Sequence, residues 1–183
     1  MHRVVRVLGW SGAALLGWLL VGAFAFDRLV AAPHLAWVER TLQHATASER
    51  QPPLILIDML HRANGDRLNG LLARRALSSG EKGRHERLIH QASELGLALL
   101  LSAHFSDQEI EAAYLASAFM GLSDGGFEAA SLKYLGVSLA RVDAAQAARL
   151  VAIAWAPSAY LGNPERVEQR AQRLLALPPA QAR

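Results

Sequence analysis

Apolar side chains recur along this chain at the spacing of amphipathic helices, and no stretch shows the strict alternation expected of a strand. The pattern therefore predicts a mainly α fold. Helices are expected at Pro33–Thr46, Leu54–His61, Leu68–Leu77 and Arg84–His104, with further helices after residues 106, 143 and 163. The polar run Ser48–Pro53 is expected to break the first helix, and Ser79–Gly83 is expected to form a loop.

The segment Arg84–His104 has the clearest helical stripe, formed by Leu88, Ala92, Leu95 and Leu99. Residues at this spacing share one face of a helix. The pattern predicts that this face is buried and that the helix is central to the fold.

Three local signals mark where later helices begin. The spacing of a capping box occurs twice, at Ser106 with Glu109 and at Asp143 with Gln146. In a capping box the first side chain accepts a hydrogen bond from the backbone amide three residues later, and the side chain of that later residue accepts one from the backbone amide of the first. Asn163 followed by Pro164 supplies a cap and a proline at the first helical position. These signals predict helices that start at about residues 107, 144 and 164.

The segment Val7–Phe26 is uncharged and long enough to cross a bilayer as a helix of about 30 Å. Arg3 and Arg6 precede it, so the positive-inside rule predicts residues 1–6 in the cytoplasm and the rest outside. The alternative is a signal peptide cleaved after Ala23-Phe24-Ala25, which has the small-x-small form of a cleavage site.

Length, charge and composition limit the number of domains and the classes of function that the chain can have. A chain of 183 residues has room for one anchor and one modest domain. The net charge is only +3 and its arginines are scattered, so we expect no nucleic-acid partner. The absence of cysteine excludes disulfides and thiolate chemistry.

Several runs in the second half of the chain, in order, carry a resemblance to one family. They are Phe105–Leu115, Gly126–Gly136, Leu139–Leu150, Ala156–Tyr160 and Asn163–Arg166. Together they resemble the peptidoglycan glycosyltransferase domain of glycosyltransferase family 51, also called the transglycosylase domain. The resemblance implies an incomplete, helical, lysozyme-like lobe at residues 68–177, preceded by a helical linker or degenerate first lobe at 27–67 and followed by a tail at 178–183.

This family joins lipid-linked disaccharides into glycan strands, and a glutamate acts as general base. The signature that carries this glutamate has no counterpart here; Asp58 and His61 offer an acid and a histidine at a different spacing. By resemblance, Glu94 corresponds to the family's second acid. Asp58 or Asp66 is then a candidate for a displaced second carboxylate, by the paired-carboxylate logic of sugar chemistry.

Candidate substrate-binding residues follow from the same resemblance and are His90, Gln91, Arg74 and Glu128. His90 lies one turn before Glu94, so the two could bind a metal or relay a proton, or simply form a pair at the solvent edge of a helix. By resemblance, the metal would be Mg or Mn; no metal ligand is assigned. Glu128 is also interpreted as fixing its loop by hydrogen bonds.

The leading hypothesis is a single-pass bacterial inner-membrane protein whose carboxyl-terminal domain faces the periplasm and assists peptidoglycan synthesis with little or no catalysis. Its expected partners are a lipid-linked peptidoglycan precursor or a glycan strand, the inner membrane, and other cell-wall synthesis proteins. The alternatives are an active transferase or glycan-cleaving enzyme that uses Glu94, and a truncated gene product without a function of its own.

Overall fold

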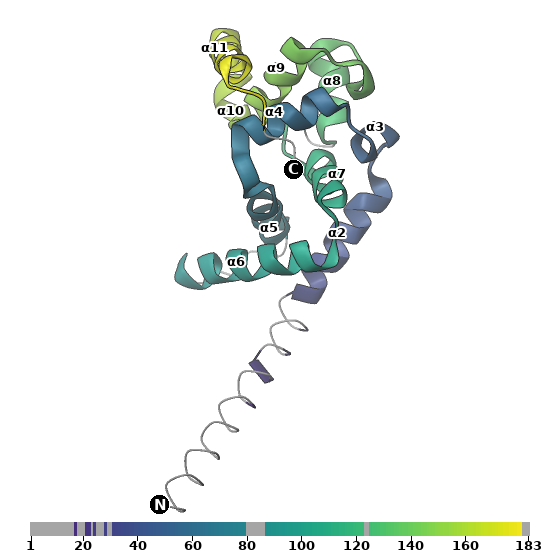
Figure 1. Ribbon diagram of the computed structural model, residues 1–183, viewed down its shortest axis with the longest axis vertical. Helices are drawn as coiled ribbons and strands as arrows, with labels where there is room; N and C mark the ends of the chain where they lie inside the picture. The colour runs from purple at the N-terminus through teal and green to yellow at the C-terminus, as the bar shows by residue number, and fades with distance from the viewer. Residues whose placement is uncertain are drawn as a thin grey trace, which may run out of the picture.

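The structure, a computed structural model, describes residues 31–79, 87–122 and 125–180, together with the single residues 17, 21, 22, 24 and 28. Within these residues every regular element is a helix, which confirms the mainly α prediction. The elements are α2 (Ala32–His44), α3 (Ala47–Arg50), α4 (Leu54–Asn64), η2 (Gly65–Arg67), α5 (Leu68–Ser79), α6 (Arg87–His104), α7 (Asp107–Ser117), α8 (Phe127–Leu135), η3 (Leu139–Arg141), α9 (Ala144–Trp155), α10 (Pro157–Tyr160) and α11 (Pro164–Ala176). Figure 1 shows α6 at the lower end of the folded part and α8, α9 and α11 at the upper end.

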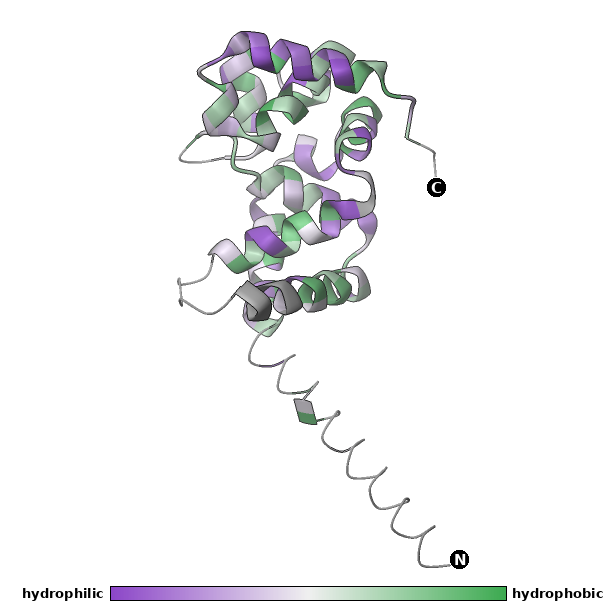
Figure 2. Cartoon of the chain, turned by 90° about the vertical axis from the view of Figure 1, so that its left-hand side faces the viewer, coloured by the Kyte–Doolittle hydropathy of each residue, from purple (hydrophilic) through white to green (hydrophobic). Residues whose placement is uncertain are grey.

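Two apolar clusters hold these helices together. The lower cluster joins α2, α5, α6 and the first half of α7, and the upper cluster joins α4, α8, α9 and α11 with the end of α7. Tyr114 of α7 packs against both clusters. The centroid of its ring lies 6.2 Å from the ring centroid of Phe127, which belongs to the upper cluster. Helix α7 therefore connects the two halves. The outermost helix, α11, is mostly hydrophilic (Figure 2).

The three helix starts predicted from local signals are confirmed. The Ser106 and Glu109 side chains form a capping box at the start of α7, and Asp143 and Gln146 form one at the start of α9. The Asn163 side chain accepts from the Arg166 amide at the start of α11. The predicted break after the first helix is only partly right, because Thr46 and Glu49 form a third capping box that begins the short helix α3.

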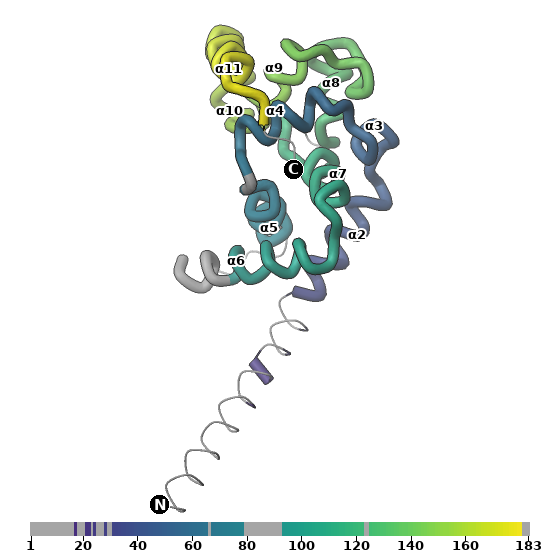
Figure 3. The backbone as a smooth tube through the Cα atoms, in the orientation of Figure 1, coloured from purple at the N-terminus to yellow at the C-terminus, as the bar shows by residue number. Residues whose placement is uncertain are grey.

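The predicted central position of the helix at 84–104 is wrong. Leu95 and Leu99 of α6 are 70% and 73% exposed, whereas Leu97 and Leu101 are fully buried. Residues 95–101 are apolar on nearly every side, apart from one glycine, so the stripe through Leu95 was not the only face available for packing. Helix α6 packs chiefly on α5 and forms the edge of the domain (Figure 3).

The predicted membrane segment Val7–Phe26 lies almost wholly outside the described residues. Among the helices that the structure does describe, none combines the length and apolar character needed to cross a bilayer.

Candidate functional site

The candidate acid Glu94 is paired with the candidate binding residue Arg74. Glu94 lies on α6 and Arg74 lies on the neighbouring helix α5. The Arg74 Nη2 donates to Glu94 Oε1 at 3.1 Å, and Arg74 Nε donates to Oε2 at 3.3 Å. The two parallel bonds form the forked arrangement that arginine makes with a carboxylate. Sequence reasoning named both residues but did not predict that they contact each other.

The packing of α5 on α6 explains why this pair forms at the surface. Leu72, Ala73 and Ala76 of α5 are fully buried, as are Leu97 and Leu101 of α6. With these side chains inward, the Arg74 side chain stays 68% exposed, and the Glu94 side chain is 25% exposed. The pair therefore lies at an open, solvated edge, where a phosphate or sugar can reach the arginine.

The side chains of His90 and Gln91, one turn before Glu94, lie outside the part of the chain that the structure describes, as does the side chain of Asp66. Among the described residues, no three His, Asp or Glu side chains gather into a possible metal site. Both Glu94 oxygens already accept bonds from Arg74. The described residues thus do not form a site that fits the Mg or Mn implied by the family resemblance.

Asp58, the candidate second carboxylate, is held by partners of its own. Its Oδ2 accepts from Arg62 Nη2 at 2.5 Å, and its Oδ1 accepts from the Ala180 amide at 2.9 Å. The Arg62 bond, above all, lowers the pKa of the Asp58 carboxyl. Arg62 also donates to the Leu177 carbonyl at 2.7 Å, so this pair fastens the segment after α11 onto α4.

Asp58 and Glu94 are not joined by any hydrogen bond or ion pair among the described residues. In Figure 1, α4 lies above α5, whereas α6 lies below it. The structure therefore gives no support to a catalytic pair made of these two carboxylates.

Glu128 links three segments that are distant in sequence. Its Oε2 accepts from Ser48 Oγ at 2.6 Å and from the Leu139 amide at 2.9 Å. The Glu128 amide donates to Oε1 of Glu49, which is only 3% exposed. Glu128 therefore has the hydrogen bonds of a residue that holds α3, α8 and η3 together. Its proposed part in binding substrate stays a prediction.

Sequence reasoning did not find a second histidine and glutamate pair. His61 Nε2 of α4 lies 3.0 Å from Glu111 Oε1 of α7, with the two side chains 37% and 15% exposed. Asp58 and His61 are close in sequence, but the hydrogen-bond partner of His61 is 50 residues away and no local signal identifies it.

A small cavity of about 70 Å³ lies between α4, α5, α7 and α9. Its lining includes Asn64, Leu71, Tyr114 and Trp155. Burial raises the pKa of the Tyr114 hydroxyl. A cavity of this size has room for water but not for a sugar ring.

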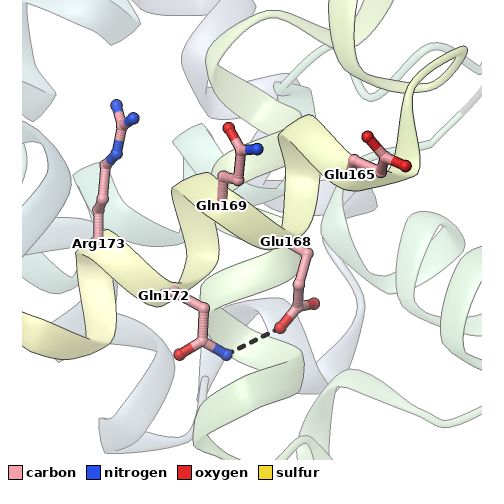
Figure 4. A pocket seen from close by; sticks show the side chains of 5 residues that line it. All are labelled: Glu165, Glu168, Gln169, Gln172 and Arg173. Carbon is pink, nitrogen blue, oxygen red and sulfur yellow. Dashed lines mark hydrogen bonds between the residues drawn. The ribbon is translucent and has the colours of Figure 1, made fainter.

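Two shallow hollows lie elsewhere on the surface. One, of about 490 Å³, is lined by five residues of α11 alone, and Figure 4 shows that they project from one helix without a facing wall. The other, of about 530 Å³, lies between α2, α3 and α7 and is lined largely by polar side chains, including Gln43, Gln51 and Gln108. Neither hollow includes Glu94 or Arg74.

The helical fold and the ordered motifs on α7, α8, α9 and α11 define the class of the protein as a helical domain of the transglycosylase type. The family model described as Transglycosylase matches residues 72–177, which is more than half of the chain. The chain belongs to this family, and the resemblance stated from its motifs is confirmed.

Curated relatives match a shorter part of the chain than the family model does. Penicillin-binding protein 2a of Streptococcus pneumoniae serotype 2 is 41% identical over 70 residues, which cover 38% of this chain and 10% of that protein. The protein of the same name from a second strain of S. pneumoniae gives the same values. The chain thus spans about a tenth of the length of these relatives.

Proposed function

We propose that this protein is an envelope protein, anchored in the bacterial inner membrane, that binds a lipid-linked peptidoglycan precursor or a glycan strand without polymerising it. Membership of the transglycosylase family supports a substrate of this kind. The uncharged segment Val7–Phe26, after Arg3 and Arg6, supports the anchor and a periplasmic domain. Other cell-wall synthesis proteins are its proposed partners.

The pairing of Glu94 with Arg74 is the observation that supports binding without polymerisation. A general base has to be directed at the proton that it removes, within hydrogen-bond reach of it. Both Glu94 oxygens already accept bonds from Arg74. The family's signature that carries the general-base glutamate also has no counterpart in the sequence.

The same geometry supports binding. Arg74 is 68% exposed and uses Nε and Nη2 for Glu94, so the guanidinium still has donors directed elsewhere. Arginine binds phosphate oxygens through charge-assisted hydrogen bonds. Arg74 is therefore the residue that we assign to the pyrophosphate of a lipid-linked precursor, with Glu94 positioning its side chain.

The enzyme alternative is favoured by one observation, the His61–Glu111 pair. A partly exposed histidine held by a carboxylate is a common acid and base arrangement. In this alternative His61 or Glu94 removes the proton of an acceptor hydroxyl, and the protein transfers or cleaves glycan.

The experiment measures both binding and polymerisation. Full-length protein in detergent is mixed with fluorescent lipid-linked disaccharide and with Mg or Mn, and polymer and bound ligand are followed separately. The variants are Arg74→Gln, Glu94→Gln and His61→Gln, and the control is Glu39→Gln, which changes an exposed acid on α2. We expect saturable binding without polymer, and binding weakened about tenfold or more in Arg74→Gln, the loss expected for a charge-assisted hydrogen bond.

Polymer that disappears in Glu94→Gln or His61→Gln would establish the enzyme alternative, since loss of a general base lowers the rate by about 100-fold to 10,000-fold. Neither binding nor polymer from folded protein would refute both functions.

A further inference from the structure

The small cavity between α4, α5, α7 and α9 is lined by two polar side chains that the fold leaves partly unsatisfied, Asn64 and Tyr114. The Asn64 Nδ2 donates to the Leu60 carbonyl at 3.0 Å, and its Oδ1 has no hydrogen-bond partner among the described residues. The Tyr114 hydroxyl likewise makes no hydrogen bond to a described residue. Polar groups of this kind are usually bonded in native proteins, so the cavity suits a ligand that offers both a donor and an acceptor.

This combination of groups matches a secondary amide. Burial raises the pKa of the Tyr114 hydroxyl, which therefore stays protonated and can donate to an amide carbonyl. The Asn64 Oδ1 can accept from the amide N–H. The rest of the lining is apolar and suits an acyl methyl group; it consists of Ala63, Leu71, Val151, Ala154 and Trp155. At about 70 Å³, the cavity has room for an acetamido group but not for the sugar ring that carries it.

Trp155 adds an aromatic surface at the opening of the same cavity. It is the last residue of α9 and is 59% exposed, although it lines the cavity. Arg170 of α11 covers one face of its ring, with the guanidinium carbon 4.2 Å from the ring centroid, and this cation–π contact holds the indole in place. The electronegative face of an aromatic ring attracts the C–H bonds of a sugar. Trp155 can therefore support a sugar ring whose acetamido group enters the cavity.

We propose that Asn64, Tyr114 and Trp155 form a subsite for an N-acetylhexosamine of a glycan strand, with the acetamido group in the cavity and the sugar ring stacked on Trp155. This inference rests on the proposed function, which supplies the glycan ligand, and it adds the residues that select the sugar. The residues that line the cavity carry no charge, so this subsite does not require the pyrophosphate that is assigned to Arg74. A soluble oligosaccharide without lipid is therefore a sufficient probe.

The test compares two soluble tetrasaccharides that differ in the acetamido group. One is a tetramer of N-acetylglucosamine, and the other is cellotetraose, which has the same linkage and a hydroxyl in place of each acetamido group. Isothermal titration calorimetry measures their binding to full-length protein in detergent. The variants are Asn64→Leu, Tyr114→Phe and Trp155→Ala. The matched control is Phe119→Ala, which removes another exposed aromatic side chain that does not line the cavity, and far-ultraviolet circular dichroism verifies that each variant is folded.

We expect the N-acetylglucosamine tetramer to bind about tenfold more tightly than cellotetraose, the effect of one or two hydrogen bonds. Asn64→Leu and Tyr114→Phe should each reduce this preference several-fold. Trp155→Ala should instead weaken the binding of both sugars and leave the ratio of their affinities unchanged, because it removes the platform and not the amide contacts. Phe119→Ala should bind both sugars as the wild type does.

Equal affinity for the two sugars would overturn the subsite, as would a preference that is unchanged in both Asn64→Leu and Tyr114→Phe. If neither tetrasaccharide binds while the lipid-linked disaccharide still binds through Arg74, the subsite is overturned and the proposed function is left intact. If folded protein binds none of the three ligands, the proposed function is refuted together with the subsite.

Discussion

Replacement of Glu128 by alanine is expected to lower the free energy of unfolding by about 2 to 4 kcal/mol. The carboxylate accepts hydrogen bonds from Ser48 Oγ and from the amide of Leu139, a residue with no exposed surface. A hydrogen bond to a charged group contributes about 1.5 to 3 kcal/mol, and a buried amide left without an acceptor costs about 1 to 3 kcal/mol. These effects overlap, so their sum is an upper limit.

A conservative variant separates the hydrogen bonds from the charge. Both bonds end on the same oxygen, Oε2, so a glutamine at position 128 can keep both with its carbonyl oxygen. Glu128→Gln should therefore lose only about 1 kcal/mol, the difference between charged and neutral acceptors. The control Glu39→Ala, at an exposed position of α2, should change stability by less than about 0.5 kcal/mol.

Urea unfolding followed by far-ultraviolet circular dichroism measures these differences, provided that the slope with denaturant is unchanged. If Glu128→Ala were as stable as Glu39→Ala, Glu128 would not hold α3, α8 and η3 together. Binding of the lipid-linked disaccharide by the folded Glu128→Gln variant then tests the predicted part of this residue in substrate binding.

Three further predictions follow from the structure. Asp58→Asn should destabilise the protein by about 1 to 3 kcal/mol near neutral pH. The pKa of Asp58 is lowered in the folded protein, so its carboxylate contributes to stability above the pKa of the unfolded chain, and this contribution is lost as pH falls through the lowered pKa. Urea titrations should therefore show that the free energies of unfolding of the variant and the wild type converge in acid. Gly126→Ala should cost more than about 2 kcal/mol, measured in the same way, because its Cβ would lie 1.9 Å from the carbonyl oxygen of Leu115. A double-mutant cycle of Arg74→Gln and Glu94→Gln should give a coupling below about 1 kcal/mol, because the pair is solvated; a much larger value would mean that the pair is structural.

Features with local causes were predictable from the sequence. The capping boxes at Ser106 and Asp143 involve residues three apart, so the sequence contains the whole interaction. The capping box of Thr46 has the same form, but the prolines that follow it predict a break in the helix. The prolines do end α3, which is only four residues long.

Features with distant causes were not predictable. The Asp58 carboxylate contacts the Ala180 amide, which is 122 residues further along the chain, and the Glu128 carboxylate contacts Ser48, which is 80 residues earlier. The orientation of α6 depends on which of two apolar faces meets α5, and periodicity alone cannot decide between faces that are both rich in leucine. Because the face of α6 that packs on α5 could not be predicted, the pairing of Arg74 on α5 with Glu94 on α6 could not be predicted either.

The distribution of these contacts is consistent with the proposed function, in which a member of this family keeps its fold without polymerising glycan. Gly126 and Glu128 lie where α7, α8 and α3 meet, so packing and buried hydrogen bonds constrain them whether or not the protein acts on a sugar. Glu94 and Arg74 lie on an edge, and an exposed ion pair adds little to stability. Substitutions beside this pair therefore change the chemistry at small cost to the fold. In the proposed function the retained pair contributes mainly to recognition, and the binding measurements with Arg74→Gln test that role directly.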